Sequence, residues 1–392
     1  MTSTDIPRWN PVLALYGVVA VGAAAGLPFV RVAPNRLLSG EPVFLWDVFQ
    51  RQDSLLTVAL FLAVATLLCM AIRQPKRRLL QVVVSLAMAA SLAGLWLLAS
   101  HVSRSMSPAD NPLARTSLGA GFWVLATLAW LIAVDAVARL NWAILPRLLW
   151  QLAWCVPLIL SWHEGQHLSV VQEYAHHSEV FGAAILRHLQ IVVLAVVPAV
   201  VIGVPLAWRM AHSQVLRQGL FPLLNGIQTV PSIALFGLLM APLAWLAMQW
   251  PALGNAGISG VGLAPAVLAL LLYSLLPIVR SALAGLEQVP AATVDAARAM
   301  GMSSWQILWQ IELPLQLPVL LVGLRTAVVQ TTGLAAVSAL IGAGGLGQIM
   351  FDGLFSAAND LVILGVVPIV VLAMLADGFF KVLESLLRAP AP

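Results

Sequence analysis

Uncharged, apolar runs of about 20 residues recur along almost the whole of this 392-residue chain. A helix of about 20 residues crosses the hydrocarbon core of a bilayer, and inside that core only helices and closed barrels satisfy their backbone polar groups. Hydrophobic residues make up 61% of the chain and charged residues only 9%, against roughly 25% charged residues in soluble proteins. The sequence therefore predicts an all-α, polytopic integral membrane protein surrounded by lipid.

We expect about ten spans, divided into two groups of five by a longer polar segment. The spans cover residues 11–30, 54–72, 79–100, 118–138, 142–160, 188–211, 220–240, 261–283, 317–341 and 361–383. Residues 1–160 are interpreted as an accessory transmembrane region, residues 161–187 as a periplasmic segment, and residues 188–392 as the working half. Cys69 and Cys155 both lie in apolar stretches, so no disulfide framework is expected.

The distribution of Lys and Arg predicts the orientation in the membrane. If the amino terminus is cytoplasmic, most of these residues fall on the inner side, including the run Arg73, Lys76, Arg77 and Arg78. Loops rich in Lys and Arg stay in the cytoplasm, so both termini are expected inside, in a multi-pass protein of the inner membrane. The first span is interpreted as uncleaved, because its apolar run is long for a secretory signal.

The stretch from Asp295 to Pro314 is the most polar long interruption in the second half of the chain, and together with the residues from Pro290 onward it predicts two short helices joined by a glycine. Pro290 can open the first helix, and Gly301 can end it in the left-handed conformation. Ser303 and Gln306 form a capping-box pattern for the second helix, which we expect to end before Pro314. This segment, called the elbow below, lies between two spans on the cytoplasmic side and is predicted to contact a partner.

Trp305, Leu308 and Trp309 are spaced to share one face of the second helix of the elbow. We expect this face to pack on the membrane domain. The first helix, rich in small residues, would then be left to dock on the partner.

The chain carries no phosphate-binding loop, which needs a Lys after a glycine-rich turn. Its two lysines, Lys76 and Lys381, follow Pro75 and Phe380. The GxGxxG pattern at residues 342–347 follows an apolar span and not a strand, so it does not predict dinucleotide binding. Any ATP chemistry therefore belongs to another subunit, and this chain is not expected to be an enzyme. The net charge of +4 is attributed to membrane topology and not to nucleic-acid binding.

Two charged features are each open to two interpretations. On a helix, His163 and His167 would share a face and could bind zinc, but Gly165 lies between them, and we expect a solvated loop without metal. Arg325 and Asp377 lie at similar depths in their spans, and because intramembrane charges are costly we hypothesise that they pair. The alternative is that the Arg325 side chain extends to the inner surface.

One pattern in the elbow resembles the EAA loop of ABC importer permeases, with Asp in place of Glu. It consists of Asp295, Ala296, Ala297, Gly301, Ile311, Leu313 and Pro314. The resemblance implies a type I, MetI-like permease core in the C-terminal half, with residues 285–317 as a coupling loop that sits on a nucleotide-binding ATPase subunit. It also implies that ATP and Mg bind to that subunit, so that this chain holds no cofactor. A second permease subunit, either the same chain or a paralogue, and a periplasmic solute-binding protein would complete the importer.

Three further stretches resemble the permeases for the osmoprotectants glycine betaine, carnitine and choline. They are residues 228–232, residues 272–280, and residues 323–326 together with residues 341–347. Ordinary members of that family lack the first five spans. The stretches NPVLAL at Asn10 and APNRLLSGE at Ala33 resemble those of a long form of the family.

The resemblance implies import of quaternary amines, which are bound by aromatic faces and carbonyl groups more readily than by a cage of carboxylates. The candidates for lining the path are Gln228, Thr229, Pro231, Ser232 and Tyr273, each of which could instead serve packing. One alternative is a permease for an amino acid such as methionine, which would share the elbow. Another, from a different class, is a channel or carrier that works without ATP.

Overall fold

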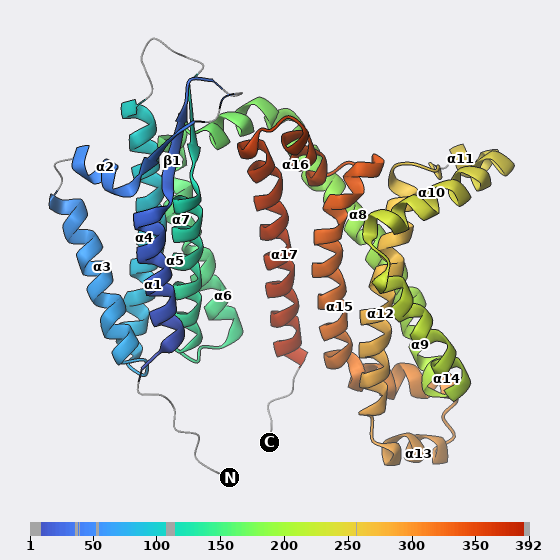
Figure 1. The fold of residues 1–392 in the computed structure, drawn as a ribbon. Helices are drawn as coiled ribbons and strands as arrows, with labels where there is room; N and C mark the ends of the chain where they lie inside the picture. The colour runs from blue at the N-terminus through green and yellow to red at the C-terminus, as the bar shows by residue number, and fades with distance from the viewer. Residues whose placement is uncertain are drawn as a thin grey trace. The chain divides into compact units, whose positions relative to one another are not determined.

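The computed structural model describes residues 9–35, 38, 40–51, 55–106, 114–255 and 257–387, without the side chains of residues 51 and 55–62 (Figure 1). The predicted span start Ser54, both chain ends and part of the stretch that begins at Ala33 lie outside the described residues. The chain divides into two compact units, Met1–His176 and His177–Pro392. This boundary falls inside the segment interpreted as periplasmic, residues 161–187.

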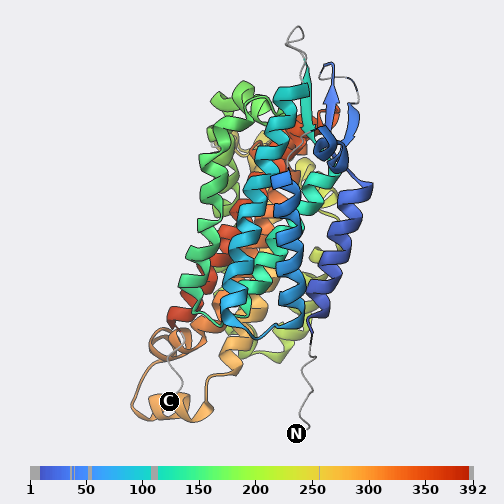
Figure 2. The same cartoon turned by 90° about the vertical axis from the view of Figure 1, so that its left-hand side faces the viewer.

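The first unit is built mainly from apolar helices that lie side by side (Figure 2). They are α1 (Pro11–Gly26), α2 (Leu45–Arg51), α3 (Leu55–Arg73), α4 (Arg78–Met106), α5 (Ala120–Ala138), α6 (Ile144–Ala153) and α7 (Cys155–Leu160), followed by the 3₁₀ turn η1 (Trp162–Gly165). The predicted fifth span is therefore two helices that meet at Trp154. Pro157 explains the break, because it has no N–H to donate to the carbonyl of Ala153.

A small antiparallel sheet, which the sequence analysis did not predict, lies at one end of these helices (Figure 1 and Figure 2). Its strands are β1 (Pro28–Ala33), β2 (Glu41–Phe44) and β3 (Arg115–Leu118), in the order β2-β1-β3. Val30 pairs with Val43 on one side and with Leu118 on the other. The prediction that the first span continues to Val30 is wrong: helix α1 ends at Gly26, because Pro28 cannot continue it and β-branched residues follow.

The opposite ends of α1, α3 and α5 are joined by hydrogen bonds around Asn10. The backbone N–H of Asn10 donates to the carbonyl of Ile72 at 2.9 Å, and its side-chain amide donates to Asp135 Oδ2 at 3.1 Å. Arg139 donates to both carboxylate oxygens of Asp135, at 2.8 and 3.1 Å. Asn10 is buried, so this cluster fixes where the three helices begin and end.

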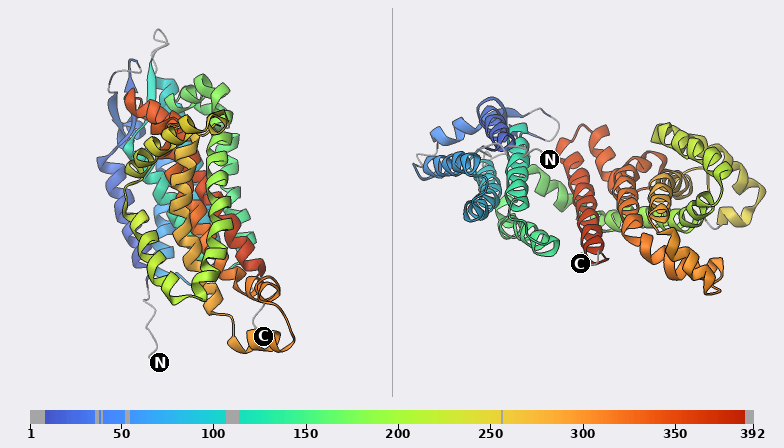
Figure 3. Two further views of the ribbon diagram at one scale, coloured as in Figure 1. Left: turned by 90° about the vertical axis from the view of Figure 1, so that its right-hand side faces the viewer. Right: turned by 90° about the horizontal axis from the view of Figure 1, so that it is seen from below.

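The second unit is all helical within the described residues (Figure 1 and Figure 3). Its elements are α8 (Ser169–Ala211), α9 (Gln214–Thr229), α10 (Ser232–Gln249), α11 (Pro251–Asn255), α12 (Leu263–Glu287), α13 (Ala291–Ala299), α14 (Ser304–Ile307), a π-helical turn (Leu308–Glu312), α15 (Leu313–Val337), the 3₁₀ turn η3 (Ser338–Ile341), α16 (Leu346–Phe355) and α17 (Asn359–Leu387). Helix α8 begins just before the boundary between the two units and continues into the second.

Two predicted spans in this half differ in extent from the helices. Helix α8 begins at Ser169, before the predicted span start His188, and its 43 residues correspond to about 65 Å, roughly twice the thickness of a bilayer core, so that a span occupies only part of it. The predicted span 220–240 is two helices, α9 and α10, separated at Val230. Val230 is extended, with φ −71° and ψ 129°, because the following Pro231 disfavours helical geometry in the residue before it.

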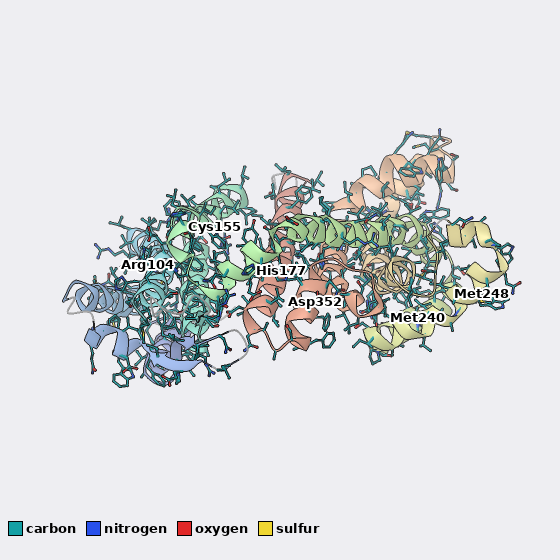
Figure 4. All side chains as sticks on the ribbon, turned by 90° about the horizontal axis from the view of Figure 1, so that it is seen from above. Arg104, Cys155, His177, Met240, Met248 and Asp352 are labelled. Atoms are coloured by element: carbon teal, nitrogen blue, oxygen red, sulfur yellow. The ribbon has the colours of Figure 1, made fainter. Side chains whose placement is uncertain are left out.

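The predicted all-α membrane architecture is confirmed. Among the described residues, seven helices are long and apolar enough to cross a membrane, and three shorter apolar helices cover Pro11–Gly26, Ala63–Arg73 and Ile144–Leu160. The expectation of about ten spans depends on these three shorter helices. Helix α10, on which Met240 and Met248 are marked in Figure 4, leaves most of its apolar surface exposed, with Met248 79% exposed.

Helices α12 and α15 approach most closely at glycines. A Cβ atom at Gly323 of α15 would lie 2.5 Å from the carbonyl oxygen of Pro277, and one at Gly285 of α12 would lie 2.8 Å from Cβ of Gln316. Side chains at these positions would push the two helices apart. Gly333, also on α15, has open space around it.

We expect Gly323→Leu to destabilise the protein by about 1–3 kcal/mol or more, since overpacking forces backbone shifts. Gly333→Ala is the matched control and should be neutral or stabilise by up to about 1 kcal/mol, because Ala is the better helix former. Thermal unfolding of the purified protein in detergent measures both. Equal melting temperatures for Gly323→Leu and the unchanged protein would contradict the close contact.

Candidate functional site

The first helix of the elbow, α13, ends as the sequence predicts. Gly301 has φ +84°, its N–H donates to the carbonyl of Arg298 at 2.9 Å, and the N–H of Met302 donates to the carbonyl of Ala297 at 3.1 Å. These two bonds form a Schellman motif, which satisfies carbonyls that the end of the helix leaves free. The predicted left-handed glycine is confirmed. Helix α13 lies beyond the ends of α12, α15 and α17 in this unit (Figure 1 and Figure 3).

The predicted capping box of the second helix is also confirmed. The backbone N–H of Ser303 donates to Gln306 Oε1 at 2.8 Å, and the N–H of Gln306 donates to Ser303 Oγ at 3.3 Å. The expectation that this helix ends before Pro314 is wrong. It continues through the π-helical turn into α15, with the N–H of Leu313 donating to the carbonyl of Leu308, and Pro314 follows as the second residue of α15.

The residues of the coupling pattern differ in exposure. Asp295, Ala296, Gly301 and Pro314 are exposed, Ile311 and Leu313 are half-buried, and Ala297 is fully buried. The carboxylate of Asp295 lies 3.5 Å from the guanidinium of Arg298, one helical turn away and also exposed. Helix α13 therefore presents a surface of small residues with one ion pair.

The predicted buried face of the second helix is wrong for its two tryptophans. Trp305 is 67% exposed and Trp309 52% exposed, with ring centroids 5.4 Å apart, whereas Ile307 and Leu308 are buried. Helical spacing shows which side chains share a face, but it does not show which of two apolar faces is covered.

Of the candidate path residues, Tyr273 is 4% exposed and holds the break between α9 and α10 in place. Its hydroxyl donates to the carbonyl of Val230, and its own carbonyl accepts from Gln228 Nε2 at 2.8 Å. Thr229 Oγ1 donates back to the carbonyl of Gly226 at 2.7 Å. Tyr273 thus pairs with the carbonyl of Val230, the residue that Pro231 keeps out of helical geometry.

A groove of about 700 Å³ lies among α9, α12 and α15. Its lining residues are Gln228, Leu276, Pro277, Arg280, Ser281, Ala284, Gln288, Pro318, Val319, Val322, Gly323, Thr326 and Gln330. The structure brings Gln228 to this groove, but Thr229, Pro231, Ser232 and Tyr273 are not among its lining residues. Within the described part of the chain, Arg280 is the single charged lining residue, and its guanidinium donates to Asn225 Oδ1 at 2.6 Å.

Charged side chains of α15 and α17 meet on another face of the second unit. Arg325 Nε lies 3.8 Å from Asp377 Oδ1, and Arg325 Nη1 lies 3.4 Å from Glu384 Oε1. Lys381 Nζ lies 2.6 Å from Asp377 Oδ2. The sequence analysis proposed Arg325 with Asp377 and missed Glu384, although residues 377, 381 and 384 share a helical face and could have indicated it.

The two other sequence features have structural explanations. His163 lies in the 3₁₀ turn η1, where its Nδ1 is 2.9 Å from Gln166 Nε2, so it does not share an α-helical face with His167. The described residues hold no group of three His, Cys, Asp or Glu side chains arranged to bind a metal. In the glycine-rich segment 342–347, the carbonyl of Ala343 accepts from Arg187 Nε at 2.9 Å, and a Cβ at Gly345 would lie 3.3 Å from His188.

We expect Arg325→Met to destabilise the protein by about 3–5 kcal/mol, because it leaves the carboxylate of Glu384 buried without a counter-charge. The double variant Arg325→Met/Glu384→Leu should recover most of this loss, since both charges are then removed. Asp377→Asn should cost less than Arg325→Met, because its side chain is 38% exposed. Thermal unfolding in detergent compares the variants, and no recovery in the double variant would count against the pairing.

Comparison with known proteins matches the two halves separately. The family model described as binding-protein-dependent transport system inner membrane component matches residues 199–389. The model described as ABC transporter permease YehY, N-terminal domain, matches residues 8–171. The long form predicted from the stretches at Asn10 and Ala33 is therefore confirmed.

Three curated relatives match about half of this chain and most of their own length. The osmoprotectant import permease protein OsmW of Salmonella typhimurium is 40% identical over 201 residues, which cover 51% of this chain and 88% of OsmW. The carnitine transport permease protein OpuCD of Listeria monocytogenes is 36% identical, covering 52% and 84%. The glycine betaine/carnitine/choline permease OpuCD of Bacillus subtilis is 35% identical, covering 51% and 81%.

Among solved structures, the inward-facing MetNI methionine ABC transporter is 21% identical with a TM-score of 0.44, covering 54% of this chain and 98% of the matched chain. At this TM-score the likeness to the transporter structure does not identify the family of the chain, whereas the sequence matches do. At 40% identity over 88% of a relative, those matches are decisive. The chain belongs to the family of binding-protein-dependent inner membrane permeases of ABC importers, in the branch of the osmoprotectant permeases.

Proposed function

We propose that this chain is the permease subunit of an ATP-driven importer for quaternary-amine osmoprotectants of the glycine betaine, carnitine and choline type. The observation that carries the proposal is the match of the permease half to relatives named for these solutes, at 35–40% identity over most of their length. The chain supplies the route through the membrane. The ATPase activity resides in a partner subunit, which binds ATP and Mg.

The elbow is the proposed point of contact with the ATPase subunit. The exposed surface of α13 consists largely of alanines with the pair Asp295 and Arg298, so it has few bulky side chains to obstruct insertion into a groove. The Schellman motif at Gly301 and the capping box at Ser303 fix the angle between the two helices of the elbow. A rigid elbow transmits displacement better than a flexible loop. With both termini cytoplasmic, the elbow faces the compartment in which ATP is present.

The groove among α9, α12 and α15 is the proposed part of the translocation path on this chain. Its lining combines apolar side chains with the amides of Gln228, Gln288 and Gln330, and the described lining residues include no carboxylate. Such a surface binds a quaternary amine weakly, which suits a path whose solute is delivered by a periplasmic binding protein. A second permease subunit, a copy of this chain or a paralogue, would close the open side of the path.

Uptake of labelled glycine betaine and choline into proteoliposomes tests this function. The vesicles would contain this chain with its ATPase subunit and second permease, and the binding protein would be added outside. We expect accumulation that needs ATP and the binding protein and that stops when the ATPase subunit is inactivated. Uptake of methionine alone would contradict the solute class, and uptake that needs no ATP would favour a channel or carrier.

A second test addresses the elbow. A Cβ at Gly301 meets nothing within 4 Å in this chain, so within the chain a substitution there acts through the backbone, and Val and Asn compare side chains of similar size. Valine is strained at φ +84°, at a cost of about 1–2 kcal/mol or more, whereas Asn tolerates this conformation. We expect Gly301→Val to lower uptake per ATP hydrolysed several-fold, with Gly301→Asn close to the unchanged protein. Full uptake in Gly301→Val would rule out the coupling role.

A further inference from the structure

Glu312 is a carboxylate placed where the elbow joins the membrane-spanning part of α15. It lies in the π-helical turn Leu308–Glu312, between Ile311 and Leu313, at a position that the coupling pattern leaves unspecified. Glu312 is only 8% exposed. Burial of a carboxylate is costly unless it accepts hydrogen bonds. The group that donates a hydrogen bond to Glu312 therefore helps to determine the geometry of this junction.

The partner is Trp208, near the inner end of α8. Trp208 Nε1 donates to Glu312 Oε2 at 3.1 Å, which joins segments 104 residues apart in the sequence. The indole is itself held in place, because its ring packs against His212 with centroids 4.8 Å apart and the carbonyl of Trp208 is 2.9 Å from His212 Nδ1. The bond therefore connects the elbow to a fixed point on another helix.

The π-helical turn makes this bond sensitive to the register of the helix. In the π turn the N–H of Leu313 donates five residues back, to Leu308, and not four. If the junction changed to α-helical register, residues on one side would rotate by about 100° and shift by about 1.5 Å relative to the other. The carboxylate of Glu312 would then leave the indole of Trp208. The hydrogen bond thus favours one of two registers.

We propose that the Trp208–Glu312 hydrogen bond is a latch that holds the junction in the π register and ties the elbow to α8. Trp208 and Glu312 are positioning residues: displacement of the elbow moves α8 and α15 together as long as the bond persists. This inference rests on the proposed function of the elbow as the place where the ATPase subunit acts.

The test compares three variants in the complete complex with its binding protein. Trp208→Phe removes the donor and keeps the ring, Glu312→Leu removes the acceptor, and Glu312→Gln is the matched control because its amide oxygen accepts the same bond. We expect Trp208→Phe and Glu312→Leu each to lower uptake per ATP hydrolysed by about tenfold, as for the loss of a hydrogen bond to a charged group. The double variant should be no worse than either single one, and Glu312→Gln should stay within about twofold of the unchanged complex.

A second measurement does not depend on transport. Spin labels at the exposed residues Ala211, at the end of α8, and Met300, in the elbow, report the distance between the two by pulsed electron resonance, after Cys69 and Cys155 are changed to Ser. We expect the distance distribution to broaden or shift in Trp208→Phe and Glu312→Leu and to stay unchanged in Glu312→Gln.

The outcomes separate the latch from the function on which it rests. If the unchanged complex shows no coupling of uptake to ATP hydrolysis, the proposed function fails, while the distance measurement still tests the latch. If the unchanged complex couples normally and the variants lose uptake and hydrolysis in equal proportion, the bond only supports the fold and the latch is excluded. Two further outcomes would also exclude the latch. One is a loss of uptake per ATP hydrolysed that multiplies in the double variant, and the other is a distance between the spin labels that stays unaltered in Trp208→Phe and Glu312→Leu.

Discussion

Backbone polar groups inside an apolar core must be hydrogen-bonded, and this requirement determines whether a helix of this chain breaks at a proline. Pro157 separates α6 from α7, and its carbonyl accepts from Ser161 Oγ at 2.7 Å. Pro231 forces Val230 out of helical geometry, and the buried hydroxyl of Tyr273 then takes over the carbonyl of Val230. At Pro314 the helix is not broken: a π-helical turn leads into α15, and Pro314 is the second residue of α15. These three prolines thus give two breaks and one π turn, whereas others, such as Pro198 in α8 and Pro277 in α12, lie inside helices that continue.

Charges in the second unit are concentrated in contacts between helices and are nearly absent from the groove. Arg325 pairs with Asp377 and Glu384 to join α15 to α17, Lys381 pairs with Asp377 within α17, and Arg217 pairs with Glu287 at 2.6 Å to join α9 to the end of α12. The groove itself is lined by neutral side chains and by Arg280, whose guanidinium is engaged by Asn225. Strong charges in the groove would hold a charged solute tightly, so the scarcity of charged lining residues is compatible with the proposed role of the groove in translocation.

The parts of the fold that follow local rules could be predicted from the sequence, and the parts set by tertiary contacts could not. The end of α13 at Gly301 and the capping box at Ser303 depend on residues within one helical turn, so their sequence pattern determines them. In the three-stranded sheet, β1 pairs with β3, which lies more than 80 residues further along the chain. No local pattern in either segment predicts this pairing. The burial of Leu308 in place of Trp305 depends on which side of the elbow meets the helices. Among the five candidate path residues, Gln228 lines the groove, whereas Tyr273 lies outside its lining and donates its hydroxyl to the carbonyl of Val230.

The two compact units of the chain are matched by two separate family models. Curated relatives are covered over 81–88% of their length by about half of this chain, so a permease of this family needs little beyond that half. The first unit has hydrogen bonds of its own between distant segments: Asn10, Asp135 and Arg139 join one end of its helices, and Trp96 Nε1 donates to the carbonyl of Ser161 at 3.0 Å. Its apolar residues likewise form clusters of their own, one around Ile132 and one around Phe29. The first unit thus has apolar clusters and hydrogen bonds of its own, and it is matched by a family model of its own over residues 8–171.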